Sequence, residues 1–416
     1  MRGRPKPAAA PMRRAEEATA PRAAAVPPDD GASARRARLA VVLVFLTHGL
    51  LTGGWVPHIP LVKERLGVGT GVFGWLLLAL AAGGVAAMPL TGALINRFGS
   101  AALCRMSGLL MCLGLALPVT APSELALALA LFVFGAALGS LDVAMNAHGV
   151  AVEQRLRHAV MSSFHGWYSL GAALGAGAGG AIVGALGETA HVAATVAASL
   201  AILAVSSRLL LPSEVDRGLS DSHFAWPTPA TLGLGALAFL SLLIEGAMFD
   251  WSAIYLRQDV GVPVAVAGLG FAAFSTGMAL ARFAGDALRT RFGSVPLVLS
   301  SALALAAGLG VALAVTEPGL ATVAFGVAGL GVGNIAPVLF AGGGRAEPDA
   351  PGRGIAAVTT LGYSGFLLGP PLIGAIAEWT GLRLALGLTV VAALIIALSA
   401  RAARAADGTG RRPPQA

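Results

Sequence analysis

The sequence predicts an all-α membrane protein with twelve transmembrane helices in two six-helix pseudo-repeat bundles. Its composition is 56% hydrophobic and only 12% charged, which is not that of a soluble globule. Apolar runs of about 20 residues, the length that crosses ~30 Å of hydrocarbon, recur along the chain with short polar interruptions. Short sequence patterns also repeat between the two halves.

The net charge of +7 does not indicate a nucleic-acid-binding protein, because the basic residues lie in tails and short connections. Cys104 and Cys112 share one apolar run and have no second cysteine pair, so we expect packing and not a zinc site. No GxxxxGK, HExxH or CxxC pattern occurs. We therefore expect no metal, no cofactor, no nucleic acid and no enzymatic activity.

Residues 1–38 contain nine basic and four acidic residues and lack a periodic apolar face. Such a segment cannot repay the entropy of ordering, so a disordered basic cytoplasmic tail is predicted. The first apolar run begins near Leu39 and is too long for a signal peptide.

Twelve spans are predicted, divided by a polar connection in the middle of the chain. The N-terminal bundle (39–211) holds spans at 39–61, 72–95, 101–119, 124–148, 161–186 and 190–211. A cytoplasmic linker follows at 212–229. The C-terminal bundle (230–402) holds spans at 230–256, 264–288, 295–315, 318–342, 354–377 and 380–402, and a basic tail (403–416) closes the chain.

Basic residues set the predicted orientation, because they favour the cytoplasmic side. With the N-terminus inside, all but four of the 28 Lys and Arg are cytoplasmic; the exceptions are Lys63, Arg65, Arg257 and Arg383. We expect a multi-pass protein of the bacterial inner membrane with both termini in the cytoplasm.

The division into halves is supported by internal repetition. The chain reads LINRFGS from Leu94 and LRTRFGS from Leu288. Gly74 and Gly83 recur in the same register as Gly268 and Gly277. Parallel repeats with a binding site near the membrane midplane are a recurrent plan of secondary transporters.

These two loops resemble the loop motif of the major facilitator superfamily and its echo in the second half. The residues concerned are Gly92, Asn96, Arg97 and Gly99, then Gly285, Asp286, Arg291 and Gly293. Asn96 stands where the motif normally carries an acidic residue. Further runs, among them EGAMFDWSAIYL, MSSFHGWYSLG and LGYSGFLLGPPLIG, are similar to a little-characterised bacterial subgroup distantly like the fucose/proton symporters.

The resemblance implies that spans one, four, seven and ten line a central cavity. These spans hold His48, Asp142, Glu245 and Asn334, respectively. Intramembrane ionisable residues are rare and mark transport pathways, so Glu245 is the first candidate for proton or substrate binding. Aligning the repeats at His48-Gly49 and Glu245-Gly246 predicts that His48 faces Glu245, either as a relay or as a packing histidine.

Asp250 lies five positions after Glu245, about 140° around the helix, so the two are not expected to share a face. Because Trp251 and Tyr255 follow, interfacial anchoring and transport are equal alternatives. Asp142 and Asn146 are one turn apart and are expected to form a hydrogen-bonded pair or a jointly presented polar site, or, for Asp142, only to brace the connection from Glu153 to Arg157.

The fifth span begins with a polar aromatic cluster that includes His165, for which interface anchoring and substrate contact both remain open. Tyr363, in the LGYSG run, completes the candidate substrate- and proton-binding set. Arg282 and Asp286 are four residues apart and are expected to form a local ion pair.

The sequence therefore predicts a secondary transporter that moves a small solute across the bilayer by alternating access, coupled to protons. A drug or metabolite efflux carrier and a non-transporting receptor that keeps the fold are the alternatives. A monomer is compatible with these features.

Overall fold

The computed structural model describes residues 31–212 and 225–407, and within these ranges all regular secondary structure is helical. Eleven helices are long and apolar enough to cross a membrane. A pair bent by 59°, Leu382–Leu398 and Ala400–Ala406, supplies a twelfth span if it is counted as one. The predicted all-α membrane fold is confirmed, and the predicted number of twelve spans is reached when this bent pair is counted.

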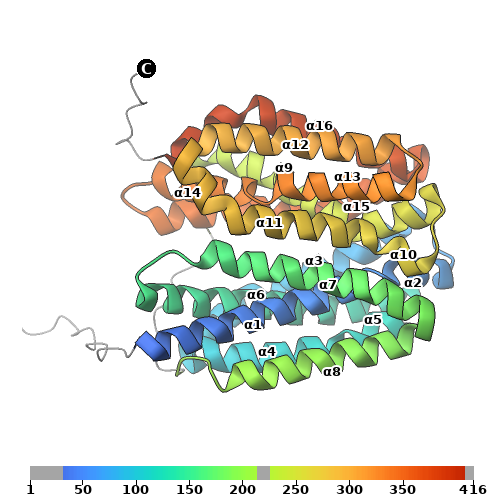
Figure 1. The fold of residues 1–416 in the computed structure, drawn as a ribbon, viewed down its shortest axis with the longest axis horizontal. Coiled ribbons are helices and arrows are strands. Elements are labelled where there is room, and N and C mark those ends of the chain that lie inside the picture. The colour runs from blue at the N-terminus through green and yellow to red at the C-terminus, as the bar shows by residue number, and fades with distance from the viewer. Residues whose placement is uncertain (1–30, 213–224, 408–416) are drawn as a thin grey trace, which may run out of the picture.

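Helices of the first half occupy the lower part of Figure 1. They are α1 (Gly31–Trp55), α2 (His58–Leu66), α3 (Thr70–Phe98), α4 (Ser100–Gly114), α5 (Ala116–Thr120), α6 (Glu124–Leu156), α7 (Met161–Leu186) and α8 (Glu188–Ser207).

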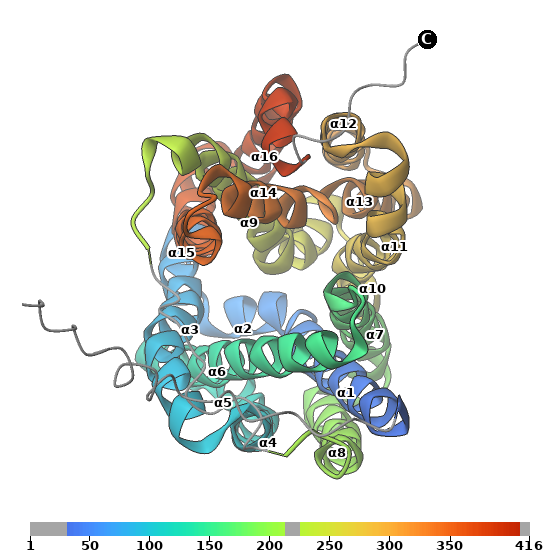
Figure 2. The same cartoon turned by 90° about the vertical axis from the view of Figure 1, so that its left-hand side faces the viewer.

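Helices of the second half lie above them in Figures 1 and 2. They are α9 (Pro229–Tyr255), η1 (Leu256–Val260), α10 (Val264–Ala267), α11 (Leu269–Phe292), α12 (Ser294–Ala314), α13 (Pro318–Val332), α14 (Ile335–Ala346), α15 (Pro351–Thr380), α16 (Leu382–Leu398) and η2 (Ala400–Ala406). The beginning of α1, in blue, and the C-terminal end of the described chain, in red, both lie at the left-hand end of the bundle in Figure 1; this end is here called the terminal end, and the opposite end is called the far end.

Two segments predicted as tail are folded. The predicted disordered tail ran to residue 38, but α1 begins at Gly31, and Ala34 and Ala37 are buried. Ala and Arg are strong helix formers, so the amphipathic start of the span extends beyond the apolar run. Ala403 and Ala406 of η2 are likewise buried. Residues 1–30, 213–224 and 408–416 of the predicted tails and linker lie outside the described residues.

Equivalent helix pairs pack in the same way in each half. α1 packs along α7 as α9 packs along α15, and α3 packs along α6 as α11 packs along α13. Glycines allow the last two pairs to approach until backbones touch: a Cβ on Gly135 would lie 1.9 Å from the Leu80 oxygen, and one on Gly329 would lie 1.8 Å from the Phe274 oxygen. Small residues at such seams are the usual means of close helix packing in membranes.

The repeated loop motif has the same geometry in both halves. Gly99 ends α3 with φ of 80°, and Gly293 ends α11 with φ of 83°, a region that favours glycine. The guanidinium groups of Arg97 and Arg291 lie over the rings that follow them, 5.1 and 5.2 Å from the centroids.

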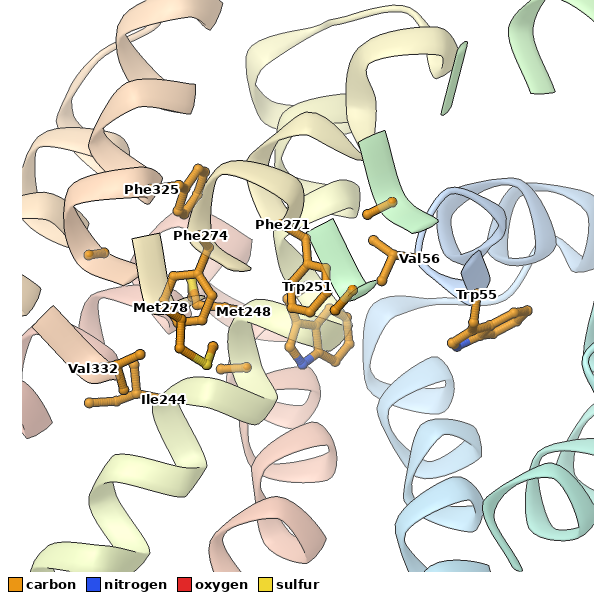
Figure 3. Close-up of a cluster of buried hydrophobic side chains, with 14 of the residues drawn as sticks. Trp55, Val56, Ile244, Met248, Trp251, Phe271, Phe274, Met278, Phe325 and Val332 are labelled. Atoms are coloured by element: carbon orange, nitrogen blue, oxygen red, sulfur yellow. The ribbon is translucent and has the colours of Figure 1, made fainter. Parts of the chain in front are cut away.

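At the far end the two halves are held together. The Gly71 N–H donates to Glu378 Oε2 at 2.8 Å, which joins α3 to α15, and Arg257 Nε lies 3.1 Å from Glu64 Oε1. Inside these polar contacts is a buried apolar cluster, in which Phe271 and Trp251 lie between Phe274 on one side and Val56 on the other (Figure 3). Both tryptophans labelled in Figure 3, Trp55 and Trp251, are fully buried.

Candidate functional site

A cavity of about 720 Å³ lies between the two halves. It is within the size range of small-molecule sites in proteins. At the terminal end its lining reaches Glu153 in the last turn of α6 and Ser162 in the first turn of α7. Toward the far end the lining stops near Asp250 and Pro370. The cavity therefore extends from the middle of the bundle to the terminal end.

Seven of the eight candidate substrate- or proton-binding residues line this one cavity, although they come from five different helices and one helix break. They are His48, Asp142, His165, Glu245, Asp250, Asn334 and Tyr363. The eighth, Asn146, does not line the cavity but donates through Nδ2 to Asp142, to its backbone oxygen at 2.8 Å and to Oδ1 at 3.2 Å.

Glu245 is paired with Arg282. The Arg282 Nη2 atom lies 3.4 Å from both carboxylate oxygens, and both side chains are largely buried, with 13% and 9% of their areas exposed. The expectation that Arg282 pairs with Asp286 is wrong: within the described residues its ion pair is with Glu245. Residues four apart can meet on a helix surface, but here the guanidinium extends across to α9.

Arg282 also joins the two halves. Its Nη1 donates to Ser169 Oγ of α7 at 2.8 Å, and Ser162 Oγ of the same helix donates to the Arg282 backbone oxygen at 2.7 Å. One residue of α11 thus binds a carboxylate of its own half and two hydroxyls of the other. Any change in the charge of Glu245 acts directly on this inter-half contact.

His48 lines the cavity with Glu245, but the two are not hydrogen-bonded to each other in the described structure. Its Nε2 lies 3.2 Å from the Leu138 oxygen, and its ring is 5.2 Å from that of Tyr168. A carbonyl only accepts, so Nε2 carries the proton. Nδ1 is then a buried acceptor, and it has no partner among the described residues.

Asp142 links α6 to the opposite half. Tyr363 of α15 donates through its hydroxyl to Asp142 Oδ2 at 3.4 Å, while Asn146 occupies Oδ1. The Asp142 carboxylate is therefore hydrogen-bonded to Asn146, as the spacing of the two residues suggests. Its second partner, Tyr363, lies 221 positions further along the chain.

Asp250 lines the same cavity as Glu245, contrary to the expectation that they could not share a face. The helix α9 is unbroken between Glu245 and Asp250. The cavity touches a broad part of its circumference, which also includes Leu242 and Phe249, so both carboxylates can face it. The interfacial-anchor interpretation also fails, since Trp251 and Tyr255 are fully buried in protein. The Tyr255 hydroxyl donates to the Ala312 oxygen at 3.2 Å.

The two remaining polar candidates, His165 and Asn334, also line the cavity. His165 packs edge-on to Phe45, with 5.2 Å between ring centroids, and its backbone oxygen accepts from Ser169. Asn334 is buried at the break between α13 and α14. It lies against Gly285 of the loop motif, where a Cβ would come within 2.2 Å of Asn334 Oδ1.

We expect Gly285→Ala to destabilise the protein through Asn334. The added methyl group meets the tip of the Asn334 side chain, which can turn away, so the cost should lie at the low end of the range for overpacking, about 1 kcal/mol. Asn334→Ala in the same background should recover most of that loss, because it removes the atom that clashes. The thermal unfolding midpoints of both single variants and the double variant measure this coupling. Strictly additive effects would contradict the proposed clash.

Sequence reasoning missed two residues that organise the site, Arg282 and Ser169. Arg282 was assigned to the inner end of its span and to a local pair. The available signal was that it lies one turn before the loop motif, inside an apolar run, where an arginine requires a buried partner. Ser169, which is one of many serines, carries no comparable signal.

Eleven membrane-length helices of the described residues, or twelve with the bent pair, form two similar halves around a central cavity that holds several ionisable side chains, and they define a polytopic membrane transporter. The Major Facilitator Superfamily profile matches residues 40–249 and 233–415. The chain belongs to this superfamily.

Curated relatives agree with that assignment. The chain is 36% identical over 365 residues to an uncharacterized MFS-type transporter of Yersinia pestis, which covers 86% of this chain and 94% of that protein. It is 33% identical over 362 residues to the membrane protein MosC of Rhizobium meliloti, and this match covers 86% of this chain and 88% of MosC. Among solved structures, the nucleoside transporter NupG shares the fold, with a TM-score of 0.65 at 15% identity over 89% of this chain and 99% of NupG.

Proposed function

We propose that this protein is a proton-coupled transporter of a small polar solute, in which Glu245 is the proton-binding residue. The observation that carries the proposal is the Glu245–Arg282 ion pair, in which Arg282 also binds Ser169 of the other half. A proton on Glu245 removes the negative charge that holds Arg282. The guanidinium is then free to change partners at the contact between the halves.

The proposal includes the orientation. With the terminal end in the cytoplasm, as the basic residues favour, the cavity opens inward and the polar and apolar contacts at the far end close the outer side. Glu378 with Gly71 and Arg257 with Glu64 would have to separate for outward opening. His48 and Asp142 are the solute ligands or relay groups of this mechanism.

Proteoliposomes containing the purified chain and a trapped pH-sensitive dye test this function. A gradient of a transported solute from a panel of sugars, amino acids, organic acids and amines should change the internal pH, and an imposed pH gradient should drive solute accumulation. Arg282→Gln should reduce both. Solute flux without any proton movement would refute the coupling.

The receptor alternative makes a different prediction in the same experiment. A chain that only senses its ligand should show a thermal shift with that ligand but no flux under any gradient. Cavity-lining polar residues in both halves support transport over this alternative.

A further inference from the structure

Asp250 is the only buried carboxylate of the cavity lining for which the described residues provide no partner. Only 4% of the residue is exposed, and it lines the cavity. Asp142 accepts from Asn146 and Tyr363, and Glu245 is paired with Arg282. An isolated buried carboxylate is costly, so it requires a proton or a positively charged partner.

The charge of the whole cavity also favours a positively charged solute. Its lining contains five carboxylate residues, Asp142, Glu153, Glu245, Asp250 and Asp286, but only two arginines, Arg282 and Arg289. A single coupling proton would leave the carboxylates in excess. Cavities lined by one sign of charge concentrate ligands of the opposite sign.

The surroundings of Asp250 suit a cation that also donates hydrogen bonds. Phe249 and Phe271 line the cavity beside it, with ring centroids 5.5 Å apart, and aromatic faces attract cations. Ser275 lies one turn after Phe271, and its buried Oγ has no partner among the described residues. Its oxygen is covered in the structure, and rotation of the hydroxyl toward the cavity would let it accept a second hydrogen bond from the same group.

We infer that the transported solute carries a protonated amine, which Asp250 binds between the Phe249–Phe271 pair and Ser275. This inference rests on the proposed function, because it takes the cavity as the solute site. The cavity volume of about 720 Å³ admits a small amine with a polar body. Asp250 is then the residue that distinguishes cationic solutes from neutral and anionic ones.

The test is a thermal-shift assay on the full chain with matched probes that differ in one functional group. Suitable sets are glucosamine, glucose and gluconate; serinol, glycerol and glycerate; and benzylamine, benzyl alcohol and benzoate. We expect an amine to raise the unfolding temperature while the alcohol and carboxylate of its set do not. Asp250→Asn should weaken amine binding by roughly tenfold or more.

The matched control is Asp259→Asn, an exposed aspartate in η1 that does not line the cavity. It should leave the amine shift unchanged. Without ligand, Asp250→Asn should unfold at the same or a higher temperature than the parent chain, since it removes an unpaired buried carboxylate. That measurement separates loss of binding from loss of folding.

Three results would overturn the inference: no amine stabilises the chain, a carboxylate stabilises it as well as the amine, or the amine shift survives Asp250→Asn. The results that would refute the proposed proton coupling are different from these three. Amine binding without amine-linked proton movement refutes the coupling alone, whereas proton-linked transport of a neutral or anionic solute refutes this inference alone.

Discussion

Glu245→Gln is expected to abolish proton-linked transport while solute exchange across the membrane continues. The amide cannot take up or release a proton, and it leaves Arg282 without its charged partner. Because no proton can bind at position 245, pH-driven accumulation should fall to the level set by solute equilibration alone. Breaking the buried charge pair should also lower stability, typically by about 2–5 kcal/mol. The measurement is dye-reported proton movement beside solute counterflow in the same proteoliposomes.

Glu124→Gln is the matched control, because Glu124 is exposed in the first turn of α6 and does not line the cavity. It should transport like the parent chain. The double variant Glu245→Gln with Arg282→Gln should regain thermal stability lost in Glu245→Gln, since both charges are gone, but it should not regain coupling. Normal pH-driven accumulation by Glu245→Gln would disprove the role of this carboxylate.

Gly329→Ala is expected to give a large loss of stability. The new Cβ would lie 1.8 Å from the Phe274 backbone oxygen, which belongs to a helix and cannot move as a side-chain tip can. Overpacking of this kind costs about 1–3 kcal/mol or more. The unfolding temperature in detergent should therefore fall by several degrees, on the order of 5 °C. The pseudo-symmetric variant Gly135→Ala should behave alike, since its Cβ would lie 1.9 Å from the Leu80 oxygen.

Gly310→Ala in α12 provides the control. No heavy atom lies within 4 Å of the Cβ position there. Because alanine favours a helix over glycine by up to about 1 kcal/mol, this variant should match or exceed the parent unfolding temperature. Equal unfolding temperatures for Gly329→Ala and Gly310→Ala would show that the α11–α13 seam can open without cost.

The sequence by itself determined the fold class and seven of the polar residues that line the cavity. Span length and apolar composition predict helices because a bilayer leaves no other partner for backbone hydrogen bonds in an open chain. The repeated LINRFGS and LRTRFGS loops identified two equivalent halves, and Gly99 and Gly293 now have matching geometry. Glu245, Asp142 and His48 could be selected because polar side chains in apolar spans are rare and expensive.

Only the tertiary structure decided which of these groups bind one another. Arg282 could meet Asp286 on its own helix, Glu245 on α9 or Ser169 on α7, and helical periodicity cannot choose among partners on different helices. The packing of α7 against α11 brought Ser169 to the guanidinium, and the contact of α9 with α11 brought Glu245 to it. Asp250 faces the cavity because the cavity borders a wider arc of α9 than one sequence-defined face, and helix packing left it without a partner among the described residues.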